Sequence, residues 1–358
     1  MGVFLIALAL YALGLVLSSV GSRLCGRCAT WCCALCGLPM WVVGGTVASL
    51  CLAMPQLMLS FLASGLFITP LAVGVALASS VAVLGLALAL CLLRRDIVVE
   101  RSEFCRKCLL LLAACLVLTF FVRDGVLSYT GTGLLMALFV LFVLQNITYQ
   151  YRYLFDRQLR MINTSPSCNV SAVDPEAYTV QTMAFPTMNL RNSLKNLAGV
   201  LFGGLLLAVG ATALLYSAVT LANLTGTIQA LWASTLLALG FSLPLLAEVL
   251  HHPLGSAWKR FSERCRFYPA KALPMQLLNC AILHITFVLP ISSLMYRQRL
   301  PVGAQYRRYD VPVCILLALI LLLPPLFKKR LYRVQGIACL LIYAGYLAAV
   351  LLVPLSGA

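Results

Sequence analysis

Carboxylates are the first groups to consider for acid–base or metal chemistry, and this chain has ten of them. They are Asp96, Glu100, Glu103, Asp124, Asp156, Asp174, Glu176, Glu248, Glu263 and Asp310. Only Glu248 lies within a long apolar run, so carboxylate chemistry inside a membrane has one candidate. The sequence has no hydrolase triad, phosphate-binding loop or metalloprotease motif, and no acidic pair suited to general acid–base catalysis. We therefore predict that the protein is not an enzyme.

Neutral oxygens are more numerous within the apolar runs. They belong to the amides of Gln56 and Asn279 and to the hydroxyls of Thr46, Ser79, Ser80, Thr235 and Ser242. Oxygens of this kind can hold a monovalent cation or a proton-linked polar solute, and we predict that these residues and Glu248 form an ion pathway. We assign no metal cluster and no cofactor beyond the ion. The structural alternative for each hydroxyl is a bond to neighbouring backbone or a small-residue contact.

Membrane helices must carry these residues. Of the 358 residues, 62% are hydrophobic and 10% are charged, and the mean hydropathy is +0.99; soluble domains have about a quarter charged residues. A spanning helix needs about 20 apolar residues. Runs of about that length occur at 3–20, 38–64, 68–93, 108–122, 128–146, 197–221, 227–250, 272–295, 311–327 and 335–354. The sequence predicts an all-α polytopic membrane protein with ten spans.

The longest polar stretch divides these spans five and five. We predict a first five-helix repeat over residues 1–147, a cytoplasmic linker loop over 148–195 and a second five-helix repeat over 196–358. Because each half has an odd number of spans, the halves run in opposite directions across the membrane. Such inverted repeats are common in secondary transporters.

The formal charge of +16 is explained by orientation and not by nucleic-acid binding, because the basic residues form short clusters between apolar runs. With the N-terminus outside, all but five of the 26 Lys and Arg residues fall in cytoplasmic loops, the exceptions being Arg123, Arg297, Arg299, Arg307 and Arg308. This bias follows the positive-inside rule. We predict that both termini are outside or luminal, that the large loop is cytoplasmic, and that the partners are lipid and small cations.

A short internal match links the two halves. Thr46 precedes Pro55 by nine residues in the second span, and Thr235 precedes Pro244 by nine residues in the seventh. Proline removes an amide donor and clashes with the preceding turn. We therefore predict helix breaks near Pro55 and Pro244, with these two spans crossing as neighbours at the centre.

A cluster of cysteines lies around the first predicted cytoplasmic loop. Its members are Cys25, Cys28, Cys32, Cys33 and Cys36. A lone Cys-x-x-Cys indicates zinc only weakly, juxtamembrane cysteines are palmitoylation sites, and thiols in a reducing loop stay free. The sequence leaves these three states open.

Span number and motifs together resemble the calcium/cation antiporter superfamily, the membrane region of sodium/calcium exchangers. The family pattern Gly-Thr-Ser-Leu-Pro-Glu is approached by residues 240–245, Gly-Phe-Ser-Leu-Pro-Leu, whereas the first copy keeps little beyond Pro55. Residues 71–80 resemble the family's glycine-rich third helix. The resemblance implies an exchanger-like fold, with the family's two ion-binding glutamates at the positions of Gln56 and Leu245 and its paired amides at Ser80 and Asn279.

A degenerate family member is indicated, because both glutamates are replaced. The resemblance implies cation antiport, but Ca²⁺ takes 6–8 oxygens and usually needs carboxylates, so the replacements favour Na⁺ or another monovalent cation. Glu248, about 4.5 Å beyond Leu245 along the helix, could supply a displaced carboxylate, or it could sit at the cytoplasmic helix end beside His251 and His252. The alternative function is a transport-inactive member that acts as a membrane interaction or regulatory protein.

Overall fold

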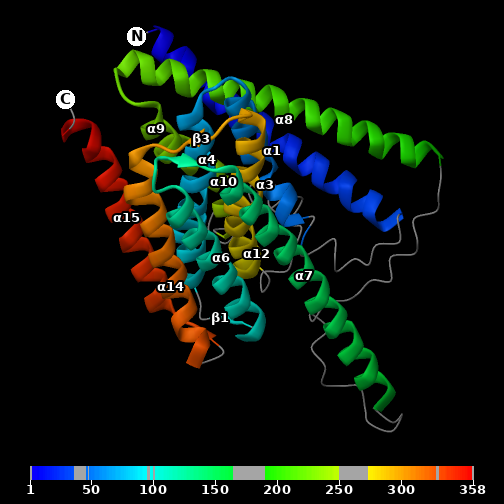
Figure 1. The fold of residues 1–358 in the computed structure, drawn as a ribbon. Coiled ribbons are helices and arrows are strands. Elements are labelled where there is room, and N and C mark those ends of the chain that lie inside the picture. Colours follow the sequence, from blue (N-terminus) through cyan, green and yellow to red (C-terminus); the bar gives the residue numbers. More distant parts are fainter. Residues whose placement is uncertain are drawn as a thin grey trace.

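The protein is a bundle of membrane helices with two small strand pairs, seen in this computed structural model (Figure 1). The structure describes residues 2–35, 46, 48–94, 97–99, 101–163, 190–249, 273–327 and 330–356. The main helical elements, in which η marks a π-helical segment, are α1 (Gly2–Leu35), α3 (Ala48–Gly65), α4 (Thr69–Ala82) with η2 (Val83–Leu88) and α5 (Ala89–Arg94), α6 (Arg101–Phe121), α7 (Tyr129–Asn163), α8 (Leu190–Thr225), α9 (Gln229–Trp232) with η3 (Ala233–Leu237) and α10 (Ala238–Val249), α12 (Leu273–Leu283) with η4 (His284–Val288) and α13 (Leu289–Tyr296), η5 (Tyr306–Asp310) with α14 (Val311–Phe327), and α15 (Arg333–Ser356).

These elements confirm the all-α polytopic fold. Eight helices of the described chain are long and apolar enough to cross a membrane, and two shorter apolar helices, Ser49–Gly65 and Gln229–Leu243, match the second and seventh predicted spans. The helix ends differ from the apolar runs. Helices α7 and α8 extend into the predicted linker, to Asn163 and from Leu190. Polar residues such as Gln and Arg are good helix formers, so a helix need not stop where its apolar run stops.

Four membrane helices form the interior, which we call the four-helix centre: α3, α4–η2–α5, α9–η3–α10 and α12–η4–α13. The third and eighth membrane helices are the most enclosed, with 89% and 83% of their apolar windows buried, against 22% for α1. Our expectation that the second and seventh spans cross as neighbours is wrong. Within the described residues, α3 and α10 each pack on α4, and the two repeats also meet at the centre where α12 packs on η2 and α3 and where α13 packs on α3.

Two short antiparallel strand pairs connect the repeats. Strand β1 (Ile97–Val98) pairs with β4 (Arg330–Leu331), and β2 (Val126–Leu127) pairs with β3 (Leu300–Pro301). In chain order, β1 and β2 flank the fourth span as β3 and β4 flank the ninth, so exchanging the repeats turns one pair into the other. Paired strands must lie on the same side of the membrane, so the chain must cross the membrane an even number of times between them. The ten-span arrangement meets this condition for both pairs.

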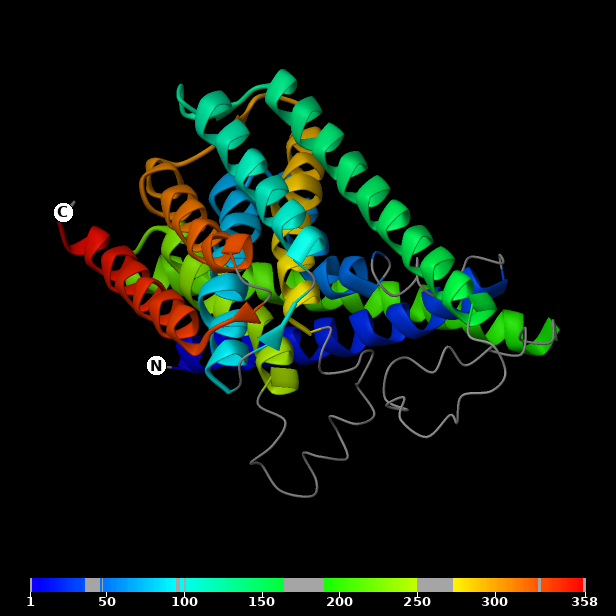
Figure 2. The same cartoon turned by 90° about the horizontal axis from the view of Figure 1, so that it is seen from below.

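The first and sixth membrane helices, α1 and α8, lie antiparallel along one side of the bundle (Figures 1 and 2). Glycines let their backbones approach closely: a side chain on Gly14 would meet the Gly210 carbonyl at 2.9 Å, and one on Gly21 would meet the Gly203 carbonyl at 2.8 Å. Small residues at such contacts are the usual basis of close helix packing in membranes. The glycines are seven residues apart on each helix, so the contact repeats every two turns.

This packing corrects the predicted place of two cysteines. Helix α1 continues through the expected first loop to Leu35, and the Cys25 thiol donates to the Val200 carbonyl of α8 at 3.5 Å. Cys28 is buried beside Gly199. The helix continues because α8 offers it a packing surface there. The side chains of Cys32 and Cys33, and all of Cys36, lie outside the described residues.

Replacing Gly203 by alanine should destabilise the protein by about 1–3 kcal/mol, because the new methyl group would meet the Cys25 backbone nitrogen and the Gly21 carbonyl at 3.0 Å. The neighbouring Gly204 has open space around it, so Gly204→Ala is the matched control and should be neutral or slightly stabilising. Thermal unfolding of the two purified variants measures the difference. Equal unfolding midpoints would show that this close approach contributes nothing.

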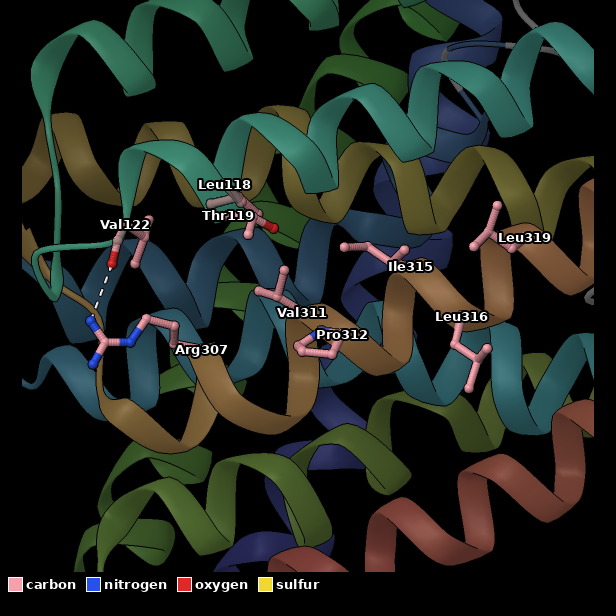
Figure 3. A pocket seen from close by; sticks show the side chains of 9 residues that line it. All are labelled: Leu118, Thr119, Val122, Arg307, Val311, Pro312, Ile315, Leu316 and Leu319. Carbon is pink, nitrogen blue, oxygen red and sulfur yellow. Dashed lines mark hydrogen bonds between the residues drawn. The ribbon is translucent and has the colours of Figure 1, made fainter.

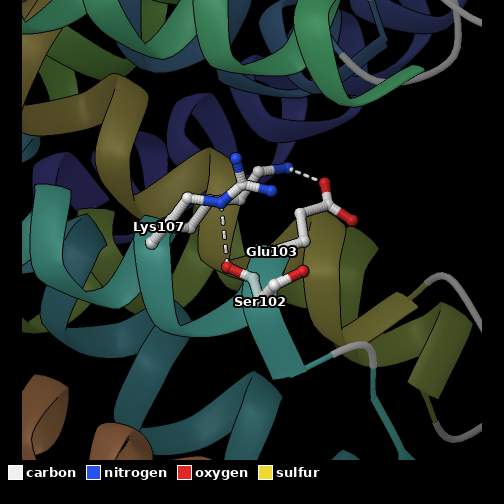
Figure 4. A network of polar contacts seen from close by, with 4 residues as sticks. Ser102, Glu103 and Lys107 are labelled. Atoms are coloured by element: carbon white, nitrogen blue, oxygen red, sulfur yellow. Dashed lines mark hydrogen bonds and ion pairs between the residues drawn. The ribbon is translucent and has the colours of Figure 1, made fainter. Parts of the chain in front are cut away.

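An ion pair is buried at the start of α6. The Lys107 ammonium lies 2.7 Å from a carboxylate oxygen of Glu103, and both residues are buried (Figure 4). We expected these residues in a cytoplasmic loop before a span that begins at 108, and that boundary is wrong. Glutamate and lysine four residues apart lie on one face of a helix and pair with each other, which allows α6 to begin at Arg101 with both charges covered.

Changing Glu103 to Gln should lower the free energy of unfolding by about 3–5 kcal/mol, because it leaves the Lys107 ammonium buried without a counter-charge. Arg106→Gln is the control, since the half-buried Arg106 side chain bonds only the Ser102 carbonyl among the described residues, at 3.0 Å, and should cost about 1 kcal/mol or less. Adding Lys107→Met to Glu103→Gln should recover much of the loss. Chemical denaturation of the variants in micelles gives these values; a double variant no better than Glu103→Gln would contradict the explanation.

Candidate ion-binding centre

A stripe of polar side chains follows one face of α3. Ser49, Gln56, Ser60 and Ser64 are spaced by seven, four and four residues, which places them on one side of the helix. All four are buried, with Gln56 only 1% exposed. This face points into the four-helix centre and supplies it with neutral oxygens. Of the four, only Gln56 was predicted as a site residue.

The Ser60 hydroxyl ties three helices together. It donates to the Ala72 carbonyl of α4 at 2.5 Å and lies 2.7 Å from the Ser292 hydroxyl of α13. The Ser292 hydroxyl in turn donates to the Val288 carbonyl at 2.9 Å. The node therefore joins two helices of the first repeat to one of the second. Helical spacing of serine would have indicated the Ser60 face, but the sequence contains no signal for its partner in the other repeat.

A second polar node lies deeper along α4. The Ser80 hydroxyl donates to the Ala281 carbonyl of α12 at 3.3 Å and to its own Ala76 carbonyl at 3.0 Å. Asn279, two residues before Ala281 on α12, is also buried, at 1% exposed, so the segment of α12 that carries Asn279 packs beside Ser80, and the predicted pairing of the two side chains stays a prediction. Ala72 and Ser80 are eight residues apart, which separates the two nodes by about 12 Å along α4.

Gln56 lies between the two nodes. It is one turn from Ser60 on α3, and because α3 and α4 are joined by a short turn and run antiparallel, it lies at about the level of Ala76. When its amide is assigned to suit the surrounding acceptors, the nitrogen donates to the Leu52 and Ala53 carbonyls at 3.2 Å. The amide is thus anchored on its own helix.

Three oxygens in the four-helix centre remain without a hydrogen-bond partner among the described residues. They are the hydroxyls of Ser64 and Ser79 and the amide oxygen of Gln276, all buried. Ser79 is a predicted site residue, whereas Ser64 and Gln276 were not predicted. Buried polar oxygens are normally satisfied, so three unsatisfied ones within one set of helices mark the region that can accept a positive charge.

The seventh membrane helix supplies fewer polar groups to the four-helix centre than α3 does. The Thr235 hydroxyl donates to the Leu231 carbonyl at 2.6 Å and the Ser242 hydroxyl to the Leu239 carbonyl at 2.7 Å. These bonds match the structural alternative stated for hydroxyls in membrane helices. Leu245, at the position where the resemblance places a glutamate, is 3% exposed and packs in the apolar core.

The predicted helix breaks are not where the sequence placed them. Helix α3 runs without interruption through Pro55, and α10 runs through position 244. The irregular backbone lies instead in the π-helical segments: Thr46 is in π-helical backbone and Thr235 lies in η3. Membrane helices tolerate proline because neighbouring groups satisfy the freed carbonyl. The Thr positions of the internal match thus mark the irregular turns, and the prolines do not.

Proline does account for two other π-helical segments. Pro290 and Pro312 each follow the end of such a segment, η4 and η5, by two residues. Each proline removes the amide that would bond the carbonyl four residues earlier, which lies inside the π-helical turn. Such turns are frequent at functional sites. In η3, the Leu236 carbonyl accepts a bond from the Tyr11 hydroxyl of α1 at 2.6 Å, so α1 is anchored at this irregular turn.

Glu248 stays a prediction. Its backbone belongs to α10, but its side chain lies outside the described residues. Within the described residues no group of three or more His, Cys, Asp or Glu side chains could hold a metal ion. His284 is buried in η4, with its Nε2 atom 3.6 Å from the Cys280 thiol.

A separate groove of about 410 Å³ lies between α6 and α14. It is lined by Leu118, Thr119, Val122, Arg307, Val311, Pro312, Ile315, Leu316 and Leu319. Its lining is almost entirely apolar, and Arg307 at one end donates to the Val122 carbonyl at 3.5 Å (Figure 3). None of the predicted ion-pathway residues borders this groove.

Known proteins resemble this chain in both fold and sequence. The family described as "Sodium/calcium exchanger protein" matches residues 275–352, which run from α12 into α15. Solved structures of the sodium-calcium exchanger NCX_Mj match nearly the whole chain. The crystals soaked with 2.5 mM Na⁺ and 10 mM Sr²⁺ match with a TM-score of 0.58 at 20% identity, covering 97% of this chain and 99% of that chain.

Other states of the same exchanger match equally well. The form soaked with 10 mM Na⁺ and zero Ca²⁺ gives a TM-score of 0.57 at 19% identity, over 97% of this chain and 99% of that one. The form with zero Na⁺ and Ca²⁺ gives 0.56 at 20% identity, over 96% and 99%. No curated protein sequence matches the chain. The chain has the sodium/calcium exchanger fold, and over residues 275–352 it also resembles the sodium/calcium exchanger family in sequence.

Proposed function

We propose that this protein is a membrane cation transporter of the sodium/calcium exchanger type whose four-helix centre binds a monovalent cation in place of Ca²⁺. The observation that carries the proposal is the set of buried neutral oxygens in that centre, of which those of Ser64, Ser79 and Gln276 have no hydrogen-bond partner among the described residues. A buried oxygen without a hydrogen-bond partner lowers the stability of the folded protein by about 1–3 kcal/mol. A monovalent cation, which is less strongly hydrated than Ca²⁺, would coordinate several of these oxygens at once.

The charge balance argues against Ca²⁺. Two positive charges buried among hydroxyls and amides need carboxylates to compensate them, and the two positions where the resemblance places glutamates hold Gln56 and Leu245. Both side chains are buried, and Leu245 packs among apolar residues. Na⁺ or another monovalent ion carries half the charge and suits neutral oxygens better. Glu248 remains the one acid through which a displaced site could regain a carboxylate.

The orientation is part of the proposal. Both termini lie outside or in the lumen and the segment between α7 and α8 is cytoplasmic, because the basic residues then gather in the inner loops. The strand pairs support the crossing number on which this depends. They place the loop of β1 on the side of the loop of β4, and the loop of β2 on the side of the loop of β3.

A second candidate function is a transport-inactive member that serves as a membrane interaction or regulatory protein. The observation in its favour is that cross-helix hydrogen bonds hold the centre together, with Ser60 joined to Ala72 and Ser292, and Ser80 joined to Ala281. Leu245 fills with hydrocarbon the position where the resemblance places a glutamate. If these cross-helix hydrogen bonds never break, the helices of the centre cannot move relative to one another, and the protein transports no ion.

Flux measurements on reconstituted protein separate these functions. We expect liposomes containing the protein to take up a monovalent cation tracer, whereas an outward sodium gradient should drive no Ca²⁺ uptake above protein-free liposomes. Gln56→Leu should lower the monovalent flux at least about tenfold, the effect of losing about 1.4 kcal/mol of ion binding, and Gln145→Leu in α7 is the matched control. Robust sodium-driven Ca²⁺ uptake would contradict the charge argument, and no cation flux at all would favour the inactive member.

Restoring the carboxylates tests the site positions directly. The double variant Gln56→Glu and Leu245→Glu should bind Ca²⁺ at least about tenfold more tightly than the parent, because it returns two compensating charges to the centre. Gln145→Glu adds a carboxylate to a membrane helix outside the centre and should leave Ca²⁺ binding unchanged. Titration calorimetry of the folded, monodisperse variants measures the affinities. Unchanged affinity in a folded double variant would show that these positions do not face a common site.

A further inference from the structure

Asp310 is an acid whose place the sequence did not reveal. We expected it in an outer loop before a span that begins at 311, and this boundary is wrong: Asp310 ends η5, within the apolar helix Tyr306–Phe327, and is 1% exposed. Apolar periodicity could not find it, because one acid at the end of an apolar run looks like a loop residue. It is covered by neighbouring membrane helices, to which the helix of η5 and α14 is tightly bound.

No cation compensates this carboxylate among the described residues. The ion pair of the described chain is the distant one between Glu103 and Lys107. The nearest basic side chains in sequence are directed elsewhere: Arg307 donates to the Val122 and Arg123 carbonyls, the latter at 2.5 Å, and Arg308 is exposed. An ionised carboxylate buried without a counter-charge is unfavourable, so Asp310 needs a positive charge from outside the described chain.

A tyrosine of the tenth membrane helix faces the carboxyl group. The Tyr346 hydroxyl on α15 faces Asp310, and the Tyr343 ring lies beside that of Tyr346, with 6.0 Å between ring centroids. Both carboxylate oxygens and both hydroxyls are buried, and none reaches a hydrogen-bond partner at normal distance and angle among the described residues. The carboxylate of η5 and the Tyr346 hydroxyl of α15 therefore face each other unsatisfied, with a single negative charge between the two helices.

Close packing fixes the positions of these groups. The Tyr306 hydroxyl donates to the Pro70 carbonyl at 2.6 Å and anchors η5 on α4. On the other side, Gly85 of η2 leaves room for Tyr343, because a side chain at Gly85 would meet the Tyr343 Cβ atom at 2.8 Å. The oxygens are thus held by the third, ninth and tenth membrane helices together.

We propose that Asp310 and the hydroxyl of Tyr346 bind one monovalent cation, either an alkali-metal ion or a proton. One carboxylate neutralises one positive charge, whereas a divalent ion would leave an excess charge buried. Neutralisation is the chemistry that both ions share. This site lies outside the four-helix centre, and its binding can be measured without transport, so it stands or falls independently of the proposed function.

The test is the thermal unfolding of the full purified chain. Sodium chloride replaces choline chloride at constant ionic strength and neutral pH, with sodium raised from about 1 to about 100 mM. A ligand that binds only the folded state raises the midpoint temperature of unfolding by several degrees over such a range. A parallel series in choline is acidified stepwise. Asp310→Asn should be as stable as the parent in choline or more so, and should abolish the response to the ion that the site binds.

Two further variants make the result specific. Asp124→Asn removes an exposed acid in the turn after α6 and should respond like the parent. Tyr346→Phe keeps the charge but removes one oxygen ligand, and should raise the half-saturating sodium concentration of an alkali-metal site about threefold or more. A sodium response lost in Asp310→Asn identifies an alkali-metal site, and an acid response lost in that variant identifies a proton site. If the parent, Asp310→Asn and Tyr346→Phe shift alike in both series, or if Asp310→Asn does not fold and Tyr346→Phe responds like the parent, the proposal is wrong.

Discussion

The hydrogen bonds of Ser60 show the constraint on which the rest of the centre depends. Neither lipid nor bulk water satisfies a polar group between enclosed membrane helices, so each group needs a partner on a neighbouring helix. Ser60 finds its partners in the Ala72 carbonyl and the Ser292 hydroxyl. These bonds set the level at which α3, α4 and α13 meet, and thereby place Gln56 between the two polar nodes. The register of the two repeats is thus set by neutral oxygens.

Charge is treated differently in two other parts of the membrane domain. At the start of α6, Lys107 and Glu103 compensate each other at 2.7 Å, so both can be buried. At Asp310 a buried carboxylate faces the Tyr346 hydroxyl and has no counter-charge among the described residues. In the ion pair the two charges compensate each other, so its role is structural. The charge of Asp310 is not compensated by the described residues and can therefore bind a cation. The ninth membrane helix therefore deserves consideration beside the four helices where the exchanger resemblance places its ion ligands.

The inverted repeat is visible in features that exchange when the halves are exchanged. The strand pair β1 and β4 corresponds to β3 and β2, and α15 packs on η2 and α5 as α7 packs on η4 and α13. The π-helical segments η2 and η4 occupy the third and eighth membrane helices. The side chains at the centre follow this symmetry less closely, since α3 carries a polar stripe whereas α10 presents Leu245 to the apolar core.

The sequence by itself determined the number and approximate position of the membrane helices, because a span needs a long apolar run whatever its neighbours are, and its resemblance to the exchanger family implied the exchanger-like fold. It also identified Gln56, Ser80 and Asn279 as buried polar residues, since polar residues within such runs stand out. Tertiary structure alone decided their partners, the unbroken course of α3 through Pro55, and the burial of Lys107 and Asp310. Those outcomes depend on which helix covers which face, and contacts between segments hundreds of residues apart leave no local pattern in the chain.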